Sequence, residues 1–287
     1  MKAALAPATA SPLGVHIYAD GVAVVEVQKH NGLPTLKRFA MCPISASAGR
    51  PLRDLQIDAL RTCCEQVEGA SKSCILSVLA TQVLTRRFEL PKNARARAVQ
   101  SAAEIEADRL TKWTPEERIL SVDRLPNSNE RLLTVSKREV VSGLVDIASA
   151  ADLQAVAVDA PLTAWQRSMP SVDADAILDL SSHRPALYVS ADPIGEQALF
   201  AGAMDADALA DAVRSALIDL RTKQRLEARR LRIFGSHSEM PRLIQLLMLD
   251  AGLDVSLLTL GRAENPPWAY ALALATWPFA GTQRGSH

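Results

Sequence analysis

The residue types of a nucleophilic hydrolase occur together at one place, where Ser181, Ser182 and His183 follow Asp179. Residues that are adjacent on a strand or turn do not converge on one reacting atom, so these four do not form a catalytic triad. The Gly-x-Ser-x-Gly and His-Glu-x-x-His patterns are both missing from the sequence. The sequence therefore predicts no hydrolase or metalloprotease site and no catalytic residue.

The histidines and cysteines also lack the spacing of metal ligands. Five histidines are scattered along the chain, and the four cysteines include no Cys-x-x-Cys pair and no histidine at ligand distance. We expect buried free thiols at these cysteines and neither a zinc site nor a disulfide framework. They are Cys42, Cys63, Cys64 and Cys74.

The composition predicts a globular protein that does not bind nucleic acid. Apolar residues make up 48% of the 287 residues, which is enough for a large core. Lys+Arg and Asp+Glu are equal at 32 each, and no basic tract is interleaved with aromatic residues. Residues 1–12 read as a flexible start without a secretory pattern, and no run of eighteen apolar residues follows. We expect a cytoplasmic protein that reaches a membrane only through a partner.

Two strand-rich units of similar pattern are predicted on either side of a middle section. Alternating apolar residues at 13–27 flank the pair Asp20-Gly21, a strong hairpin signal. The first unit continues with a strand at 35–42, a helix at 53–67 and a strand at 73–80. The last unit has strands at 176–180, 186–190, 197–201, 230–234 and 254–258, and helices at 205–229, 240–251 and 269–277. This repetition indicates two related lobes.

The middle section has the element order of a small α+β unit. Its predicted strands are 84–90, 119–124, 131–136 and 154–158, and its predicted helices are 95–110, 137–151 and a short one that ends near Arg167. Five local sequences occur in this order: Glu89-Leu90-Pro91, the acidic helix 104–108, Trp113-Thr114-Pro115-Glu116-Glu117, Ser136-Lys137-Arg138-Glu139-Val140-Val141 and Val158-Asp159. This ordered set resembles the type IV pilus assembly protein PilM and the cytoplasmic part of the type II secretion L protein, two actin-like families related to FtsA.

The resemblance covers about residues 13–277 and implies an α/β, two-lobed actin-like (ribonuclease H-like) fold with an inserted α+β subdomain of the FtsA/PilM type. The domains that it implies are a flexible N-terminus at 1–12, a first lobe at 13–83, the inserted subdomain at 84–151, a return to the first lobe and linker at 152–172, a second lobe at 173–262, and a C-terminal helix that packs on the first lobe, with a tail, at 263–287.

The resemblance also implies a nucleotide site between the lobes, where small residues in turns let backbone N–H groups approach phosphates. The matching residues here are Asp20, Gly21, Asp179, Ser181, Ser182, Gly235 and Ser236. The family's leading carboxylate is replaced by His16 and its glycine by Tyr18, and Pro185 removes an N–H donor. Either a nucleotide is still held, with charge from Arg184, or these are ordinary hairpin turns; we expect weak or absent binding of ATP and Mg²⁺ and no enzyme activity.

The function implied is that of a scaffold of an inner-membrane platform for type IV pili, DNA-uptake pili or type II secretion. Its partner would be the N-terminal cytoplasmic tail of a PilN-like membrane protein, with an assembly ATPase and self-association as further candidates. The candidate partner-binding residues are Arg86, Phe88, Glu104, Asp108, Leu110 and Trp113. In the alternative interpretation, Glu104 and Asp108 form a solvated helix face and Trp113 belongs to the core. The alternative function is a nucleotide-binding actin-like ATPase or a kinase-like enzyme.

Overall fold

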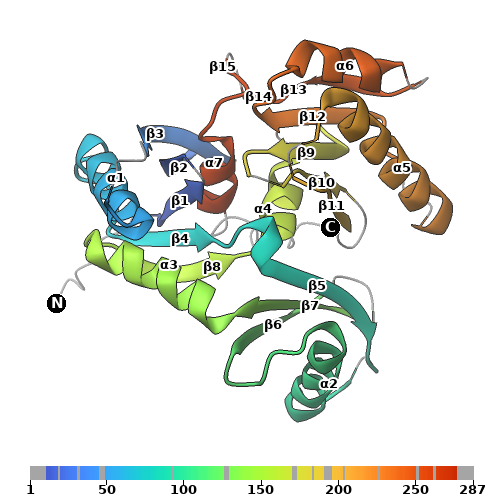
Figure 1. Cartoon of the computed structure of the whole chain (residues 1–287). Coiled ribbons are helices and arrows are strands. Elements are labelled where there is room, and N and C mark those ends of the chain that lie inside the picture. The colour runs from blue at the N-terminus through green and yellow to red at the C-terminus, as the bar shows by residue number, and fades with distance from the viewer. Residues whose placement is uncertain are drawn as a thin grey trace.

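Two five-stranded sheets, each covered by a pair of helices, form the body of the computed structural model (Figure 1). The structure describes residues 11–18, 20–30, 33–44, 49–91, 93–125, 129–169, 173–182, 184–190, 196–202, 204–224, 227–249, 252–260 and 263–276. Most of the predicted flexible start, part of the linker at 170–172 and the tail beyond residue 276 lie outside these residues. Among the described helices, none combines the length and the apolar character needed to cross a bilayer.

The first sheet has the strand order β3-β2-β1-β4-β8. Its strands are β1 (Leu13–Tyr18), β2 (Gly21–His30), β3 (Leu33–Pro43), β4 (Ser73–Ser77) and β8 (Gln154–Asp159). Tyr18 pairs with Gly21, so the predicted hairpin is confirmed, with Gly21 already in β2. The first three strands run antiparallel, whereas β4 and β8 run parallel to β1.

The alternation along β1 assigns its side chains to two different helix layers. Val15 and Ile17 pack beneath α1 (Leu52–Gln66) and α3 (Arg138–Ala150). Gly14 and His16 face the opposite side, where Gly14 lies against α7 (Ala269–Ala275). The apolar alternation that predicted the hairpin therefore reflects a sheet buried on both faces.

The second sheet repeats this order as β11-β10-β9-β12-β13. Its strands are β9 (Ala176–Leu180), β10 (Ala186–Val189), β11 (Glu196–Leu199), β12 (Arg230–Gly235) and β13 (Asp254–Leu257). Its outer face packs against α5 (Ala206–Gln224) and α6 (Met240–Met248). The described part of α5 reaches Gln224 and residues 227–229 are not helical, so the helix is shorter than the predicted 205–229.

A smaller unit is inserted between β4 and α3, at a point where the second lobe passes directly from β12 to α6. It is a sheet of order β5-β7-β6 covered on one face by α2 (Ala96–Leu110). Its strands are β5 (Val83–Glu89), β6 (Arg118–Arg124) and β7 (Glu130–Lys137), and a single 3₁₀ turn, Ala80–Gln82, precedes them. Because α3 is the counterpart of α6 and packs in the first-lobe core, we place the end of the inserted unit at Lys137, earlier than residue 151.

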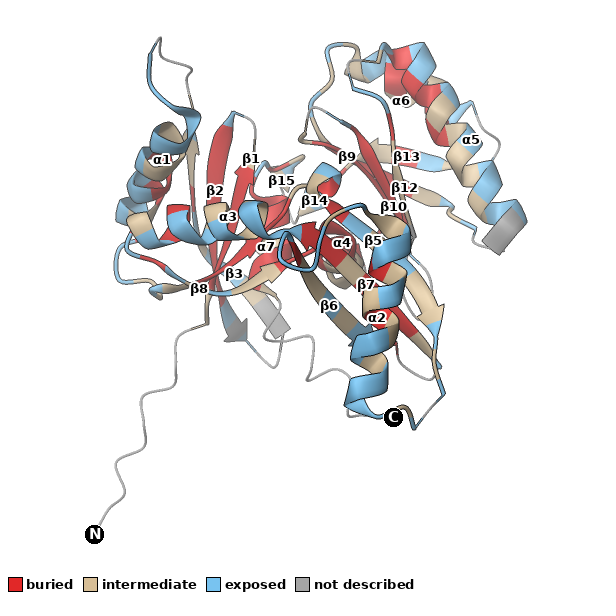
Figure 2. Cartoon of the chain, turned by 60° about the horizontal axis from the view of Figure 1, so that its bottom comes forward, coloured by how far each residue is buried: buried red, intermediate tan, exposed pale blue. Residues whose placement is uncertain are grey.

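The helix that closes each lobe packs against the other lobe. α4 (Pro161–Ser168) follows β8 but contacts β10 of the second sheet, and α7 follows the second lobe but contacts β1 and β2. A short hairpin, β14 (Thr259–Leu260) with β15 (Ala263–Glu264), leads into α7. Figure 2 shows the resulting band of buried residues, in red, through both sheets and these two helices. The exchange of helices interlocks the lobes.

Gly14 allows α7 to approach β1 to backbone contact. A Cβ atom built on Gly14 would lie 1.9 Å from the carbonyl oxygen of Ala271 and 2.6 Å from the amide nitrogen of Ala275. Both atoms belong to helix backbone, which cannot move aside as a flexible side chain can. The residue is glycine because the helix occupies the space of any side chain.

We expect Gly14→Ala to destabilise the protein by about 3 kcal/mol or more, because the methyl group forces α7 off the first sheet. Urea unfolding followed by circular dichroism measures the change. The matched control is Gly143→Ala on α3, where nothing lies within 4 Å of the added Cβ. That change should stabilise the protein by about 0.5–1 kcal/mol, as alanine does in a helix. Equal effects of the two changes would contradict the proposed contact.

Candidate functional site

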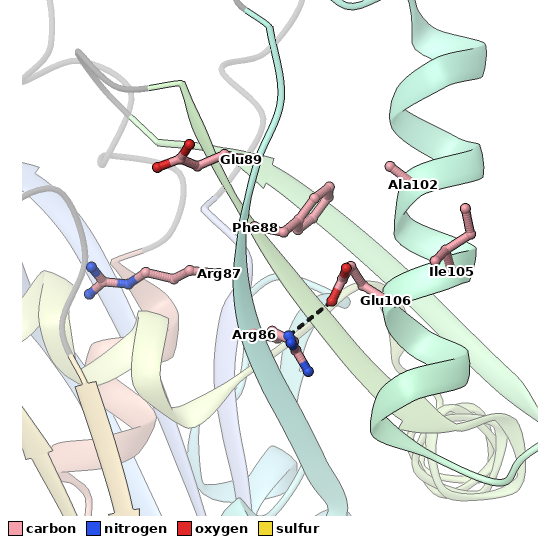
Figure 3. A pocket seen from close by; sticks show the side chains of 7 residues that line it. All are labelled: Arg86, Arg87, Phe88, Glu89, Ala102, Ile105 and Glu106. Carbon is pink, nitrogen blue, oxygen red and sulfur yellow. Dashed lines mark ion pairs between the residues drawn. The ribbon is translucent and has the colours of Figure 1, made fainter.

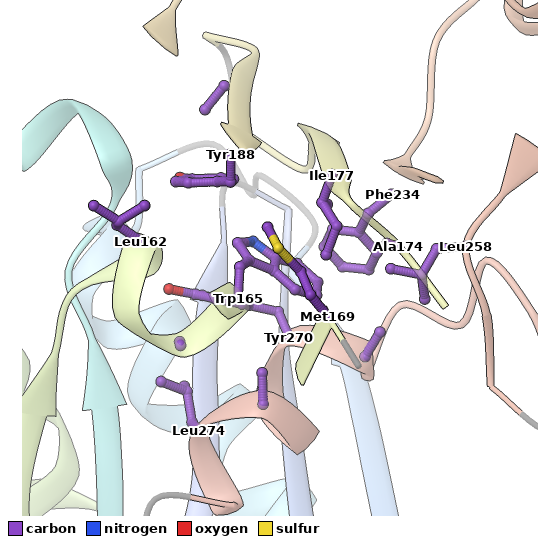
Figure 4. Packing of buried hydrophobic residues seen from close by; sticks show 14 of the residues in the cluster. Leu162, Trp165, Met169, Ala174, Ile177, Tyr188, Phe234, Leu258, Tyr270 and Leu274 are labelled. Atoms are coloured by element: carbon purple, nitrogen blue, oxygen red, sulfur yellow. The ribbon is translucent and has the colours of Figure 1, made fainter. Parts of the chain in front are cut away.

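An aromatic junction lies between the inner faces of the two lobes, around Trp165 of α4 and Tyr270 of α7 (Figure 4). Their ring centroids are 5.0 Å apart, and Phe234 of β12 meets Trp165 edge-on at 5.1 Å. Tyr188 of β10 belongs to the same cluster, and all four side chains are buried. We use "aromatic junction" below for these four residues.

Asp179, one of the residues predicted to hold a nucleotide, is bonded to this junction. The indole nitrogen of Trp165 donates to its Oδ2 at 3.0 Å, and the amide and hydroxyl of Ser181 donate to its Oδ1 at 2.9 and 2.6 Å. Burial raises the pKa of Asp179, and these three hydrogen bonds oppose the shift. Both carboxylate oxygens and the Ser181 donors therefore have partners inside the protein.

Gly235, one of the residues predicted to hold a nucleotide, has a structural reason to be glycine. Its φ is +93°, and an added Cβ would lie 2.7 Å from the backbone of Leu180 and Ser181. Its N–H donates to Oδ1 of Asn265 at 3.0 Å, and Nδ2 of Asn265 donates to its carbonyl at 2.6 Å. Asn265, itself at φ +44°, thus uses both backbone groups of Gly235. Ser236 beside it is exposed.

The turn between β9 and β10 is tied to its own strands. The hydroxyl of Ser182 donates to the carbonyl of Arg184 at 2.6 Å, and Nε of Arg184 donates to the carbonyl of Phe200 at 3.0 Å. The guanidinium that was expected to supply charge to a phosphate thus bonds to the end of β11. His183 lies outside the described residues.

His16, which stands where the resembled family has its leading carboxylate, is an uncharged part of the core. Its ring stacks on Tyr18 at 5.4 Å and meets Tyr270 edge-on at 4.5 Å. Burial lowers its pKa to about 3, and neither ring nitrogen has a hydrogen-bond partner. Asp20 is exposed in the turn, and a Cβ on Gly21 would lie 2.4 Å from Oη of Tyr18, so the Tyr18 ring covers the glycine.

The other carboxylate beside the junction is also engaged. Asp159, at the end of β8, accepts hydrogen bonds from the amide of Ala160 and the hydroxyl of Thr163 and is ion-paired with Arg167. Within the described ranges, no three His, Cys, Asp or Glu side chains are grouped to hold a metal ion. Of the residues predicted to hold a nucleotide, Asp179, Ser181, Ser182 and Gly235 thus have hydrogen-bond partners within the protein.

The inserted unit brings Arg86 and Phe88 of the predicted partner site to one cavity. This cavity, of about 410 Å³, lies between β5 and α2 (Figure 3). Nε of Arg86 is 2.9 Å from Oε2 of Glu106 on α2. The remaining lining residues are Arg87, Glu89, Ala102 and Ile105. The sequence analysis missed Glu106 and Ile105, although their positions on an amphipathic helix follow from its 3.6-residue period.

The other predicted partner-binding residues have contacts inside the unit. Glu104 and Asp108, whose side chains are 38% and 68% exposed, form ion pairs with the buried guanidinium of Arg118 at 2.6 and 2.7 Å, and neither residue lines the cavity. Leu110 and Trp113 pack against the buried residues between α2 and the sheet, as the core interpretation has it. Arg118 was missed because the sequence gives no sign that this arginine points inward.

Comparisons with known proteins agree with this architecture. The family model described as type IV pilus assembly protein PilM matches residues 14–189, which is more than half of the chain. A chain of the PilM–PilN type IV pilus biogenesis complex is 18% identical, with a TM-score of 0.66 and coverage of 93% of this chain and 98% of that chain. No curated protein sequence matches.

Two further solved structures have the same fold. The cytoplasmic domain of EpsL, an inner-membrane component of the type II secretion system of Vibrio cholerae, is 12% identical, with a TM-score of 0.56 and 95% coverage of both chains. A Bacteroides thetaiotaomicron protein with an actin-like ATPase fold is 11% identical, with a TM-score of 0.57 and coverage of 92% of this chain and 96% of that one. The predicted actin-like fold is confirmed.

We expect His16→Phe to raise the free energy of unfolding by about 1–2 kcal/mol at pH 7, because it removes two buried polar atoms that lack partners. As pH falls below 6.5, the unfolded chain binds a proton at His16 that the folded chain refuses until about pH 3. The free energy of unfolding of the unmodified protein therefore falls by about 1.4 kcal/mol per pH unit through this group, and the variant does not show this decrease. Urea unfolding between pH 7 and pH 5 measures both effects, and parallel pH curves would contradict the burial of a neutral histidine.

Proposed function

The chain belongs to the family of type IV pilus assembly protein PilM, and from this membership we propose that it is a scaffold of an inner-membrane assembly platform. The platform builds type IV pili, DNA-uptake pili or a type II secretion pseudopilus. The observation that carries the proposal is the family match over residues 14–189, which includes the first lobe, the whole inserted unit and the start of the second lobe. The protein acts in the cytoplasm and reaches the inner membrane through its partners.

The proposed partner is the cytoplasmic N-terminal tail of a PilN-like membrane protein. Support comes from the likeness in fold to a chain of the PilM–PilN complex. The inserted unit offers a cavity beside Arg86 and Phe88, where a short peptide has both a strand and a helix to contact. Contacts with an assembly ATPase and self-association are further proposals that rest on the family resemblance alone.

We also propose that the scaffold works without nucleotide. The support is chemical: Asp179, Ser181 and Gly235 already have protein hydrogen-bond partners. A nucleotide would have to break these bonds, and it would have to displace buried aromatic side chains from the junction. The alternative, an actin-like ATPase or kinase-like enzyme, would need Asp179 to exchange Trp165 for a hydrated metal ion.

We expect the purified protein to bind a synthetic peptide of the cytoplasmic tail of the PilN-like protein from the same organism, with one site per chain. Isothermal titration calorimetry gives the affinity and stoichiometry. A peptide of the same composition in scrambled order is the control. Absence of heat with the native peptide, in a sample whose folding is verified by circular dichroism, would contradict the proposed partner.

We expect ATP and Mg²⁺ at 1 mM, about 100 times a Kd of 10 μM, to leave the melting temperature unchanged within about 1 °C. A bound ligand at that excess adds about 2.7 kcal/mol of stability, which would raise Tm by several degrees in a protein of this size. Differential scanning fluorimetry measures the shift. A rise of several degrees, together with phosphate release, would support the ATPase alternative instead.

A further inference from the structure

The inserted unit joins the first lobe at a hinge made of two adjacent strands. The chain enters the unit at Val83 and leaves it at Lys137, and Val83 pairs with Ser136 where the two strands meet. The hydroxyl of Ser136 donates to the carbonyl of Gln82 at 2.9 Å, and Val83 packs with Val78 in a small apolar cluster. Because both connections lie side by side, contacts beyond the hinge decide the angle of the unit on the lobe.

Arg138, the first residue of α3, makes such a contact from the side of the first lobe. Its Nε donates to the carbonyl of Glu116 at 2.7 Å, and its Nη2 donates to the carbonyl of Arg118 at 3.1 Å. Its backbone N–H donates to the carbonyl between them, that of Glu117, at 2.8 Å. Three consecutive carbonyl groups of the inserted unit therefore accept hydrogen bonds from one residue of the helix that packs in the first-lobe core.

The planar guanidinium of Arg138 suits this arrangement. Its N–H groups point in fixed directions, so two of them reach the carbonyls on either side of the one that the backbone amide takes. A lysine at this position would carry a single ammonium group on a flexible stem, which matches two separate carbonyls less well. The geometry therefore requires arginine and is not a general effect of positive charge.

Arg118 extends the contact from this turn to α2. Its guanidinium is buried and forms ion pairs with Glu104 at 2.6 Å and Asp108 at 2.7 Å, which lie on successive turns of that helix. The buried residues of α2 are two alanines, whose methyl groups bury little area, so these charge-assisted bonds add to what holds the helix. Arg118 is thus bonded through its carbonyl to α3 and through its side chain to α2.

We propose that Arg138 is a latch that fixes the angle of the inserted unit on the first lobe and, through Arg118, makes α2 and α3 move as one body. Because α3 packs in the first-lobe core, a displacement of α2 is passed to that core, and a change in the core is passed to α2. The latch is a conformational device of the fold, and it does not depend on which partner the protein binds.

The first test removes the side chain of the latch. We expect Arg138→Ala to speed amide hydrogen exchange in α2 by about tenfold or more, although the changed residue lies in α3, because two hydrogen bonds from a charged donor are lost. Exchange in α1 and α5 should change by less than about twofold. Mass spectrometry of peptide fragments measures all three helices in one sample. If α2 exchanges no faster, or if all three helices speed up by the same factor, Arg138 is not a latch.

A matched control exists at the other end of α3. Arg61 of α1 donates through Nε and Nη2 to the carbonyl of Ala150 at 3.1 and 2.7 Å, so Arg61→Ala also removes two arginine–carbonyl bonds from this helix. Both of its partners belong to the first lobe, and we expect exchange in α2 to change by less than about twofold. An equal response of α2 to Arg61→Ala and Arg138→Ala would contradict the latch.

A conservative variant keeps the test decisive if the alanine variant does not fold. Arg138→Lys retains the charge and one donor, so its α2 should exchange faster than in the unmodified protein and more slowly than in Arg138→Ala. Circular dichroism verifies that each variant is folded. Exchange in Arg138→Lys that equals that of the unmodified protein would show that charge is enough and that the arginine geometry has no role.

The second test asks whether the two arginines act in series. Glu104→Gln removes the charge of one partner of Arg118 and leaves the contacts of Arg138 in place. If both changes interrupt the same connection, a variant that carries Glu104→Gln and Arg138→Ala should exchange in α2 about as fast as the faster single variant. If it shows the product of the two single effects instead, the contacts are independent and the coupling of α2 to α3 is wrong.

Discussion

The packing of Trp165 against Tyr270 is the contact on which the arrangement of the two lobes depends. Each residue belongs to the helix that closes one lobe and packs on the other, so the contact joins these two exchanged helices, α4 and α7. An aromatic side chain of this size buries about 150–250 Å², worth roughly 4–6 kcal/mol each before conformational entropy is subtracted. The lobes are therefore held together by side chains of the protein itself.

The same contact accounts for the hydrogen bonding of Asp179 and Ser181. The indole of Trp165 needs an acceptor once it is buried, and Asp179 supplies it; Asp179 in turn needs donors, which Ser181 and Trp165 provide. His16 is the exception, because its ring is stabilised by Tyr18 and Tyr270 while its nitrogens are left without partners. A carboxylate at residue 16 would be buried without a donor, so the histidine follows from the aromatic packing and does not require a ligand.

Periodic patterns in the sequence predicted the fold well. Single contacts between residues far apart in the chain could not be predicted from the sequence. The alternation at 13–27 fixed the hairpin because both faces of β1 are buried, and a slip of one residue would place Gly14 away from α7. The bonds of Asn265 to Gly235 and of Arg118 to Glu104 join residues 30 and 14 positions apart, and no local pattern marks them. The family resemblance singled out Asp179 and Gly235 but gave no sign of their contacts with Trp165 and Asn265.

The inserted unit differs from the lobes in how its sheet is covered. The interlocked lobes bury their inner faces against each other, whereas the inserted sheet packs one face against α2, a helix in which Ala103 and Ala107 are the buried residues. α2 is held in part by ion pairs to Arg86 and Arg118, which fix it beside the sheet without covering β5. The inserted unit therefore keeps a cavity between β5 and α2, whereas the two lobes close their inner faces on each other.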